Sequence, residues 1–234
     1  MAFETLSQTV DPALFWEYRA ILLAGLAFTG YVFLLAGLLA VVLGLAACLL
    51  RLSPFRALRW CGMFYAELCR NTPEYVLLVW VHYVLPLLLT WAVGGRVTFS
   101  PFVSAVIALG LASSGYFAET FRAGIQAIPR GHVEAARSLG MSGGLTLRRI
   151  VLPQAVRRML PEAMNQLVSL FKSTTLVSLI AVPDLMYQIS MLTQEKMQPL
   201  PLYSGAAIMY FVTIFAMSAL VRRTSERWRQ RGWA

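Results

Sequence analysis

Long uncharged runs alternate with short polar segments along this chain, and the runs predict membrane-spanning helices. Four runs without a charged residue extend from Ala20 to Leu50, Tyr75 to Gly95, Val97 to Ala118 and Met197 to Val221. An α-helix rises ~1.5 Å per residue, so about 20 apolar residues cross the ~30 Å hydrocarbon layer of a bilayer. Each run is long enough to do so. We therefore expect the chain to lie in a membrane.

The basic residues orient these runs, because they gather in three clusters after the first, third and last runs. The clusters are Arg51, Arg56, Arg59 and Arg70; Arg122, Arg130, Arg137, Arg148, Arg149, Arg157 and Arg158; and Arg222, Arg223, Arg227, Arg229 and Arg231. Basic loops stay on the cytoplasmic side of a membrane. Four spans cannot place the second and third clusters on the same side, so a fifth crossing is needed between Arg158 and Arg222.

The candidate for this fifth crossing is the segment from Ala163 to Val182, which is too polar for hydropathy alone to identify. It contains Asn165, Gln166, Ser169, Lys172, Ser173, Thr174 and Thr175. Polar and ionisable residues at membrane depth are costly and usually face a pathway or the interior of a helix bundle. The segment is therefore expected to be both a span and part of a functional site.

The fold class that follows is an all-α membrane protein with five transmembrane helices, the N-terminus outside and the C-terminus in the cytoplasm. Residues 1–19 would form a periplasmic segment. They lack the positive n-region of a signal peptide, so we expect the first span to be retained as an anchor. Residues 20–222 would form one transmembrane domain and residues 223–234 a basic cytoplasmic tail. The expected spans are about 20–50, 73–95, 98–120, 160–182 and 202–221, with a cytoplasmic loop at 122–158.

Composition agrees with this fold class and excludes others. Hydrophobic residues make up 58% of the chain and charged residues only 13%. The net charge of +9 lies in the loops beside the spans, which argues against a nucleic-acid-binding surface. Three cysteines form no C-x-x-C pair and two histidines form no H-E-x-x-H motif, so we expect no metal site. His82, in an apolar run, is expected to be a packing or interfacial residue.

Two local patterns leave their interpretation open. Ala36, Ala40, Gly44 and Cys48 recur at i,i+4 spacing, which either lets another helix approach closely or only reflects a preference for small residues. The sequence "RNTPEYVLL" from Arg70 predicts a helix start with an N-cap at Asn71 or Thr72. Glu74 then is either a first-turn acid at the positive end of the helix dipole or a ligand for a cationic substrate.

Polar residues form lines inside two of the predicted spans. Glu162, Asn165, Ser169 and Lys172 share one helical face, and Ser113, Tyr116 and Thr120 form a similar line with Glu119 beside it. Such lines could border a path for a small zwitterion, whose charged groups need replacements for water. Alternatively, Glu119 and Lys172 lie near the membrane surfaces, where they snorkel or form structural pairs.

Motifs for intrinsic catalysis are missing from the sequence. No G-x-x-x-x-G-K-[ST] phosphate loop exists, and neither Lys172 nor Lys196 follows a glycine. A G-x-S-x-G elbow and a catalytic pair of acids are also absent. We therefore expect that the chain is no enzyme and binds no ATP, so any ATP-driven work requires a partner.

The polar segment "EAARSLGMSGGLTLRRIVLP", from Glu134 to Pro153, lies between two apolar stretches. Pro129 either ends or restarts a helix, and a short helix is predicted from Gly131 to Leu139 with Gly140 as its left-handed C-terminal cap. Ser142 can cap the segment that follows. An exposed helix of about two turns suits docking into a groove of a soluble partner. It equally suits an interfacial helix on anionic lipid, and physical reasoning alone leaves both interpretations open.

This segment resembles the cytoplasmic signature of the permease subunits of binding-protein-dependent ABC importers. The matching residues are Glu134, Ala135, Ala136, Gly140, Ile150, Leu152 and Pro153. "RNTP" from Arg70, "GYFAETFRAGIQAIPRGHVEAA" from Gly115, "LPQAVRRMLP" from Leu152 and "FKSTTLVSLI" from Phe171 resemble the polar amino acid uptake branch in order and spacing. The resemblance covers about residues 70–185.

The resemblance implies a type I ABC importer permease fold in the bacterial inner (cytoplasmic) membrane. Two permease subunits, identical or homologous, would form the pathway with an ATPase dimer below and a solute-binding protein above. ATP and Mg would be bound by the ATPase subunits and no cofactor by this chain. The seven matching residues would dock the ATPase through a coupling helix that begins near Gly131. Glu74, Tyr116, Glu119, Asn165, Ser169, Lys172 and Thr174 would line the substrate pathway.

Some residues depart from the pattern of this branch. An apolar residue usually follows R-x-T-P, and often a glutamine three positions later, where this chain has Glu74 and Leu77. The usual K-D-T-S is replaced by Lys172, Ser173, Thr174 and Thr175. These changes fall in the expected pathway, and the added acid hints at a basic amino acid. The rival functions are a secondary transporter or channel driven by an ion gradient, and a membrane-embedded enzyme without an identifiable catalytic site.

Overall fold

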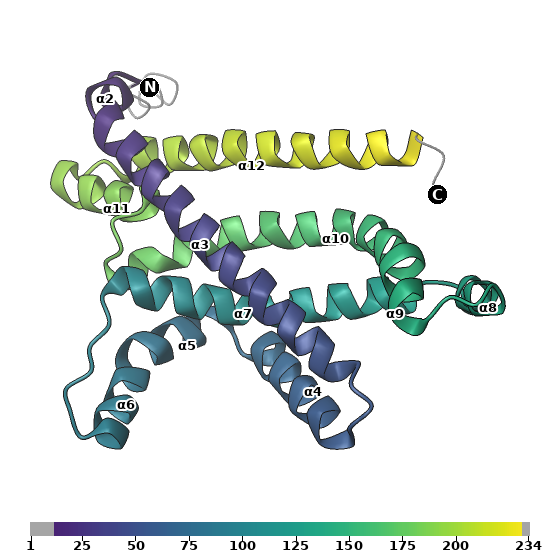
Figure 1. The fold of residues 1–234 in the computed structure, drawn as a ribbon. Coiled ribbons are helices and arrows are strands. Elements are labelled where there is room, and N and C mark those ends of the chain that lie inside the picture. The colour runs from purple at the N-terminus through teal and green to yellow at the C-terminus, as the bar shows by residue number, and fades with distance from the viewer. Residues whose placement is uncertain (1–11, 231–234) are drawn as a thin grey trace. The chain divides into compact units, whose positions relative to one another are not determined.

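A computed structural model describes the backbone of residues 12–230 and the side chains of residues 15–223. Within that range the chain is helical and has no β-strand (Figure 1). The α-helices are α2 (Pro12–Glu17), α3 (Arg19–Arg51), α4 (Arg56–Asn71), α5 (Glu74–Val79), α6 (Leu85–Val93), α7 (Pro101–Gln126), α8 (Arg130–Ser138), α9 (Gly143–Thr146), α10 (Leu152–Ser173), α11 (Leu185–Lys196) and α12 (Pro199–Gln230). Two π-helices, η1 (Trp80–Val84) and η2 (Leu147–Val151), and a 3₁₀-helix, η3 (Thr174–Ile180), complete the order.

Four segments of the described chain are long and apolar enough to cross a membrane: Arg19–Arg51, Glu74–Val93, Pro101–Gln126 and Pro199–Arg223. A fifth is present if Gly143–Ile180 and Leu185–Lys196, which are bent by 46°, count as one broken span. This pair contains the polar segment that the charge distribution assigned to a fifth crossing. The all-α membrane fold is therefore confirmed.

Several boundaries differ from the sequence-based expectation. The segment between the first two expected spans forms an amphipathic helix, α4, which contains Cys61 and Cys69 and was not predicted from the sequence. α7 continues past residue 120 to Gln126, and α10 begins at Leu152, inside the expected loop 122–158. Residues 1–11 and 231–234 of the predicted terminal segments lie outside the described residues, as do the side chains of Arg227 and Arg229.

The π-helices share a sequence feature that accounts for their position. Each ends two residues before a proline, because Leu85 and Pro86 follow η1, and Leu152 and Pro153 follow η2. Proline has no N–H and its ring crowds the preceding turn of a helix. A single wider turn accommodates this without ending the helix, which is a common use of π-bulges. Pro153 thus fixes the geometry of the junction between η2 and α10.

The described chain divides into two compact units. The first comprises residues 12–36, 74–109 and 170–217. Its apolar core consists of Leu22, Phe171, Leu185, Ile189, Leu192, Leu202, Ala206 and Tyr210. His82 Nδ1 shares a hydrogen bond of 2.9 Å with the Ser104 hydroxyl, which confirms its expected packing role.

Asp184 is fully buried in the first unit and begins α11. Its Oδ1 accepts a hydrogen bond of 2.9 Å from the backbone N–H of Tyr187, and its Oδ2 accepts one of 3.4 Å from the Tyr210 hydroxyl. The Thr29 hydroxyl accepts the N–H of Leu185 at 3.1 Å and donates to the carbonyl of Gly25. These bonds satisfy donors that a helix start leaves open, which explains how the chain bends between η3 and α11.

The second unit comprises residues Gly37–Pro73, Gly110–Ser169 and 218–230. One cluster of its core contains Ala40, Cys48, Phe117 and Phe121, and another contains Ala47, Ala66 and Ala118. Gly44 lies beside the first cluster, and a Cβ on this residue would lie 2.6 Å from the Cβ of Phe117. The small residues Ala40, Gly44 and Cys48 therefore allow close approach of α7, which resolves the alternatives left open by the sequence.

Candidate functional site

The short helix α8 ends in a motif that its sequence predicts. Gly140 has a φ of +77°, in the left-handed region where glycine is favoured. Its N–H donates to the carbonyl of Arg137 at 2.9 Å, and the N–H of Met141 donates to the carbonyl of Ala136 at 3.1 Å. This pair of bonds is a Schellman motif. The predicted cap at Gly140 is confirmed, and so is the cap at Ser142, whose side chain accepts the N–H of Leu145.

α8 presents one face inward and the other outward within the second unit. Ala136 is buried, and Val133 packs against a cluster formed by Ile128, Val151 and Ala155. His132 Nδ1 lies 2.9 Å from Gln154 Oε1, which connects α8 to α10. Glu134, Ala135 and Gly140 are exposed, and Leu139 is 83% exposed at the end of the helix. Figure 1 shows α8 beside α9 and beyond the end of α7.

The remaining residues of the signature lie at the start of α10. Ile150 is half-buried in η2, and its carbonyl accepts a hydrogen bond of 2.9 Å from Gln154 Nε2. Leu152 and Pro153 are exposed. Val151, which lies between Ile150 and Leu152, belongs to the apolar cluster against which Val133 of α8 packs. The signature therefore combines residues that fix the helix with residues that remain open to a partner.

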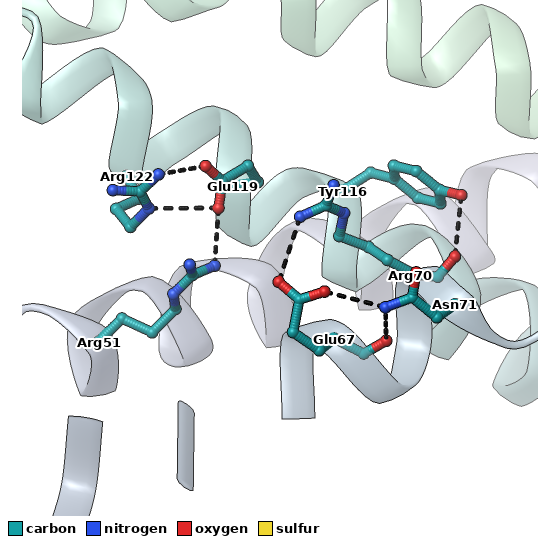
Figure 2. A network of polar contacts seen from close by, with 7 residues as sticks. All are labelled: Arg51, Glu67, Arg70, Asn71, Tyr116, Glu119 and Arg122. Atoms are coloured by element: carbon teal, nitrogen blue, oxygen red, sulfur yellow. Dashed lines mark hydrogen bonds and ion pairs between the residues drawn. The ribbon is translucent and has the colours of Figure 1, made fainter. Parts of the chain in front are cut away.

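Glu119 is the centre of an ion network on α7 (Figure 2). Its carboxylate accepts a hydrogen bond of 2.8 Å from Arg51 Nη1 of α3 and pairs through both oxygens with Arg122. Arg122 also donates to the side-chain oxygen of Gln126. The carboxylate is already occupied within this chain, which differs from the expectation of a pathway residue and favours structural pairing.

A second polar group surrounds Arg70 at the end of α4 (Figure 2). Arg70 Nη1 lies 3.6 Å from Glu67 Oε1, and its guanidinium lies 5.9 Å from the ring centre of Tyr116. The Tyr116 hydroxyl donates to the carbonyl of Arg70 at 3.2 Å. Arg70 Nε is buried and has no hydrogen-bond partner among the described residues. A buried donor of this kind can be satisfied by the carboxylate of a ligand.

The predicted N-cap before Glu74 is wrong. Asn71 Nδ2 donates to the carbonyl and the carboxylate of Glu67, both at 2.9 Å, and the Thr72 hydroxyl donates to the carbonyl of Leu68 at 2.7 Å. Both side chains therefore bond to the last turns of α4. Glu74, half-buried, is the first residue of α5, as expected for a first-turn acid.

The polar line predicted on the fifth crossing lies along α10. Glu162, Asn165, Ser169 and Lys172 are all exposed in this chain. Glu162 Oε1 accepts a hydrogen bond of 3.0 Å from Gln166 Nε2. Thr174 differs from the expectation, because its side chain is fully buried and its hydroxyl donates to the carbonyl of Phe171 at 2.7 Å. In this chain Thr174 therefore stabilises the start of η3.

Tyr65 and Ser114 form a polar contact that sequence reasoning missed. Their hydroxyl oxygens lie 2.7 Å apart, and the Ser114 hydroxyl also donates to the carbonyl of Leu111 at 2.6 Å. Ser114 has one proton, so the Tyr65 hydroxyl is the donor to it. Burial raises the pKa of Tyr65 to about 12, so this donor stays protonated well above neutral pH.

The partners of Glu119 and Arg70 were also missed, since Arg51 and Arg122 were interpreted only as topogenic charges. The spacing of Glu119 and Arg122, i and i+3, is a local signal for a pair. Arg51, however, is 68 positions from Glu119, and no local pattern connects them. Among the residues that the structure describes, no group of three or more His, Cys, Asp or Glu could hold a metal ion.

The fold and this site define a multi-pass helical membrane protein whose second unit contains a short, capped helix with one exposed face. The sequence profile of the family described as "Binding-protein-dependent transport system inner membrane component" matches residues 36–230. The chain belongs to this family of inner membrane transport components. It is therefore a multi-pass protein of the bacterial inner membrane.

Similar proteins agree over most of the chain. The arginine transport system permease protein ArtQ of Bacillus subtilis is 33% identical over 209 residues, which cover 88% of this chain and 91% of that protein. The L-cystine transport system permease protein TcyB of the same organism is 36% identical over 225 residues, covering 94% and 93%.

Solved structures also match. The crystal structure of an amino acid ABC transporter with histidines has a TM-score of 0.85 at 31% identity and covers 93% of this chain and 99% of that chain. An inward-facing structure of the MetNI methionine ABC transporter, 20% identical with a TM-score of 0.66, covers 92% of this chain and 99% of that chain. The second match supports the fold alone.

Proposed function

We propose that this chain is the transmembrane pathway subunit of an ATP-driven amino acid importer. The relatives named above are permeases for arginine and cystine, and others are named for glutamine and for glutamate and aspartate. The observation that carries the proposal is the geometry of α8, whose inner face is fixed by Ala136 and Val133 while Glu134, Ala135 and Leu139 are exposed.

The partners in this proposal are an ATPase dimer, a second permease subunit that is identical or homologous, a solute-binding protein and membrane lipid. ATP and Mg are bound by the ATPase subunits, so hydrolysis takes place outside this chain. Nucleic acid has no part in it. An ion-gradient-driven secondary transporter or channel subunit is the alternative, and the relatives do not favour it.

α8 acts as the coupling helix. Docking transmits force only if the helix cannot rotate or unwind against its own subunit. The Schellman end at Gly140, the cap at Ser142, and the contact of His132 with Gln154 all limit such motion. Closure of the ATPase dimer would then move α8, and with it η2 and the start of α10, as a rigid body that changes the access of the pathway.

The substrate pathway uses the exposed face of α10, with Asn165, Ser169 and Lys172 as the residues that face it. We also assign Glu74, Tyr116 and Arg70 to the pathway. An amino acid is a zwitterion, and these side chains offer donors for its carboxylate and acceptors for its ammonium group. Glu119 pairs with Arg51 and Arg122, and Thr174 donates to the carbonyl of Phe171, so we assign both residues a structural role.

Substitution of Gly140 tests the coupling role. A side chain at a φ of +77° is strained by roughly 1–2 kcal/mol, so Gly140→Val should reduce the population of the capped helix about 5- to 30-fold. Retention of the ATPase during purification should fall by a similar factor. Glu134→Lys, which reverses an exposed charge on α8, should also weaken retention.

Two control variants separate docking from folding. Gly140→Asn should retain the ATPase, because asparagine tolerates the left-handed region. Gly143→Ala should also retain it, because that glycine has no positive φ and a Cβ there meets nothing within 4 Å. Full retention of the ATPase by both Gly140→Val and Glu134→Lys would refute docking through α8.

A further inference from the structure

A cavity lies within the second unit, where the end of α3, the start of α4 and the end of α7 meet. Its volume is about 340 Å³, and it is lined by Arg51, Arg59, Trp60, Met63, Arg122 and Gln126. Pockets that bind small molecules have volumes of ~300–1,000 Å³, so this cavity is large enough for a small ligand or a headgroup. The ATPase-docking helix and the proposed pathway residues do not line it.

The lining of the cavity carries excess positive charge. It contains three guanidinium groups, and Glu119, which pairs with Arg51 and Arg122, supplies one negative charge beside them. Arg59 is exposed and, among the side chains of residues 15–223, forms no hydrogen bond or ion pair. Arg51 donates to Glu119 through Nη1 alone, which leaves its other donors for a ligand. The cavity therefore suits an anion with several oxygen acceptors.

The apolar residues of the cavity favour an amphipathic anion. Trp60 is 66% exposed and Met63 36% exposed at the cavity, although both are large and hydrophobic. Tryptophan is enriched at the membrane–water interface, where its ring contacts the glycerol and upper acyl region. The arginines belong to clusters that the charge distribution assigns to the cytoplasmic side, whose leaflet is rich in anionic lipid. A free phosphate ion would leave Trp60 and Met63 without an apolar partner.

We propose that this cavity binds the phosphodiester headgroup of an anionic phospholipid. Arg59 and Arg51 contact the phosphate oxygens, since planar guanidinium groups match them with paired donors. The glycerol backbone and upper acyl chains contact Trp60 and Met63. Glu119 holds Arg51 and Arg122 in place, so the ion network of Figure 2 forms one wall of a lipid site.

The test compares Arg59→Gln with Arg56→Gln. Both substitutions remove one exposed arginine from the first turns of α4, but only Arg59 lines the cavity. The full chain, purified with its partner subunits and delipidated, is titrated with phosphatidylglycerol, and bound lipid is counted by native mass spectrometry. One arginine near a membrane surface contributes ~1 kcal/mol, so Arg59→Gln should weaken phosphatidylglycerol binding about fivefold. Arg56→Gln should leave it unchanged.

Further measurements distinguish a lipid headgroup from a free phosphate ion as the bound anion. Phosphatidylcholine with the same acyl chains should bind at least fivefold more weakly, and millimolar inorganic phosphate should not displace phosphatidylglycerol. Equal binding of the two lipids, equal loss in both variants, or no loss in Arg59→Gln would overturn the proposal. Displacement by inorganic phosphate would replace a lipid site with a free-anion site. Loss of the ATPase from Arg59→Gln with normal lipid binding would assign the cavity to a protein contact and also overturn it.

Discussion

Glu119 illustrates how the role of a single side chain depends on its neighbours. In the sequence it is an acid inside an apolar run, and such acids usually mark a pathway. In the structure two arginines surround it, and its side chain is 30% exposed while that of Arg51 is 12% exposed. An acid held by two cations stabilises helix ends. Lys172, in contrast, is exposed on the polar face of α10 and is the better candidate for contact with substrate.

Glu119→Gln should lower the thermal midpoint of the purified chain, because it leaves Arg51 and Arg122 close together without an anion. We expect a loss of about 1–3 kcal/mol, below the 3–5 kcal/mol for a fully buried pair. Glu67→Gln is the matched control, since the pair of Glu67 with Arg70 is more exposed and should contribute ~0–1 kcal/mol. Equal midpoints for both variants, with slow transport in Glu119→Gln alone, would return Glu119 to the pathway.

Lys172→Ala should reduce transport without reducing thermal stability. The side chain is exposed, so thermal stability and assembly with the ATPase should be unchanged. Amino acid uptake should fall about 10- to 150-fold, because one charged contact of ~1.5–3 kcal/mol is lost. Uptake by assembled complexes, normalised to their ATPase content, measures this. Unchanged uptake would mean that Lys172 only snorkels at the membrane surface.

Among the elements, α3 and α7 depend on small residues for their contact in the second unit. Gly44→Ala should destabilise the chain by about 1–3 kcal/mol, because the new Cβ would lie 2.6 Å from the Cβ of Phe117. Gly30→Ala, on the same helix, should be neutral or slightly stabilising, since a Cβ there meets nothing within 4 Å. The thermal midpoints of the two variants provide the comparison. Similar midpoints would mean that α3 and α7 do not approach as closely as described.

Local sequence patterns predicted the elements that depend on residues close together in the sequence. Uncharged runs located α3, α7 and α12, and glycine and serine at the ends of α8 and α9 determined their caps. The helix α4 was missed because its residues are amphipathic and too charged for a hydropathy run. Asn71 and Thr72 were predicted to cap the helix that follows them, but their side chains bond to α4, which precedes them. The sequence alone does not indicate which of the two helices such side chains will contact.

The partners of the candidate site residues were less predictable, for a physical reason. Arg51 and Glu119, or Tyr65 and Ser114, meet only when helices far apart in sequence pack together. No periodicity encodes which of several arginines reaches a given acid. The charge distribution did imply that a polar segment must cross the membrane. Each span moves the chain to the other side, so a missing span would place the last basic cluster on the wrong side of the membrane.

At the level of the whole molecule, a multi-pass membrane fold, a capped and exposed helix and membership of an inner membrane transport family lead to one account. In the proposed function the chain provides the substrate pathway and the coupling helix, and partner subunits would provide ATP hydrolysis and capture of the solute. The energy source is the central claim, because a secondary transporter could share the membrane helices and the polar face of α10 but would need no ATPase.

Uptake of labelled arginine, cystine and glutamine into proteoliposomes tests that claim most directly. The liposomes contain this chain with its ATPase and solute-binding protein, and ATP is supplied on the side of the basic loops. We predict that uptake of at least one of the three requires ATP, persists when an uncoupler removes ion gradients, and is lost in Glu134→Lys. Uptake that continues without the ATPase and stops with the uncoupler would contradict the account.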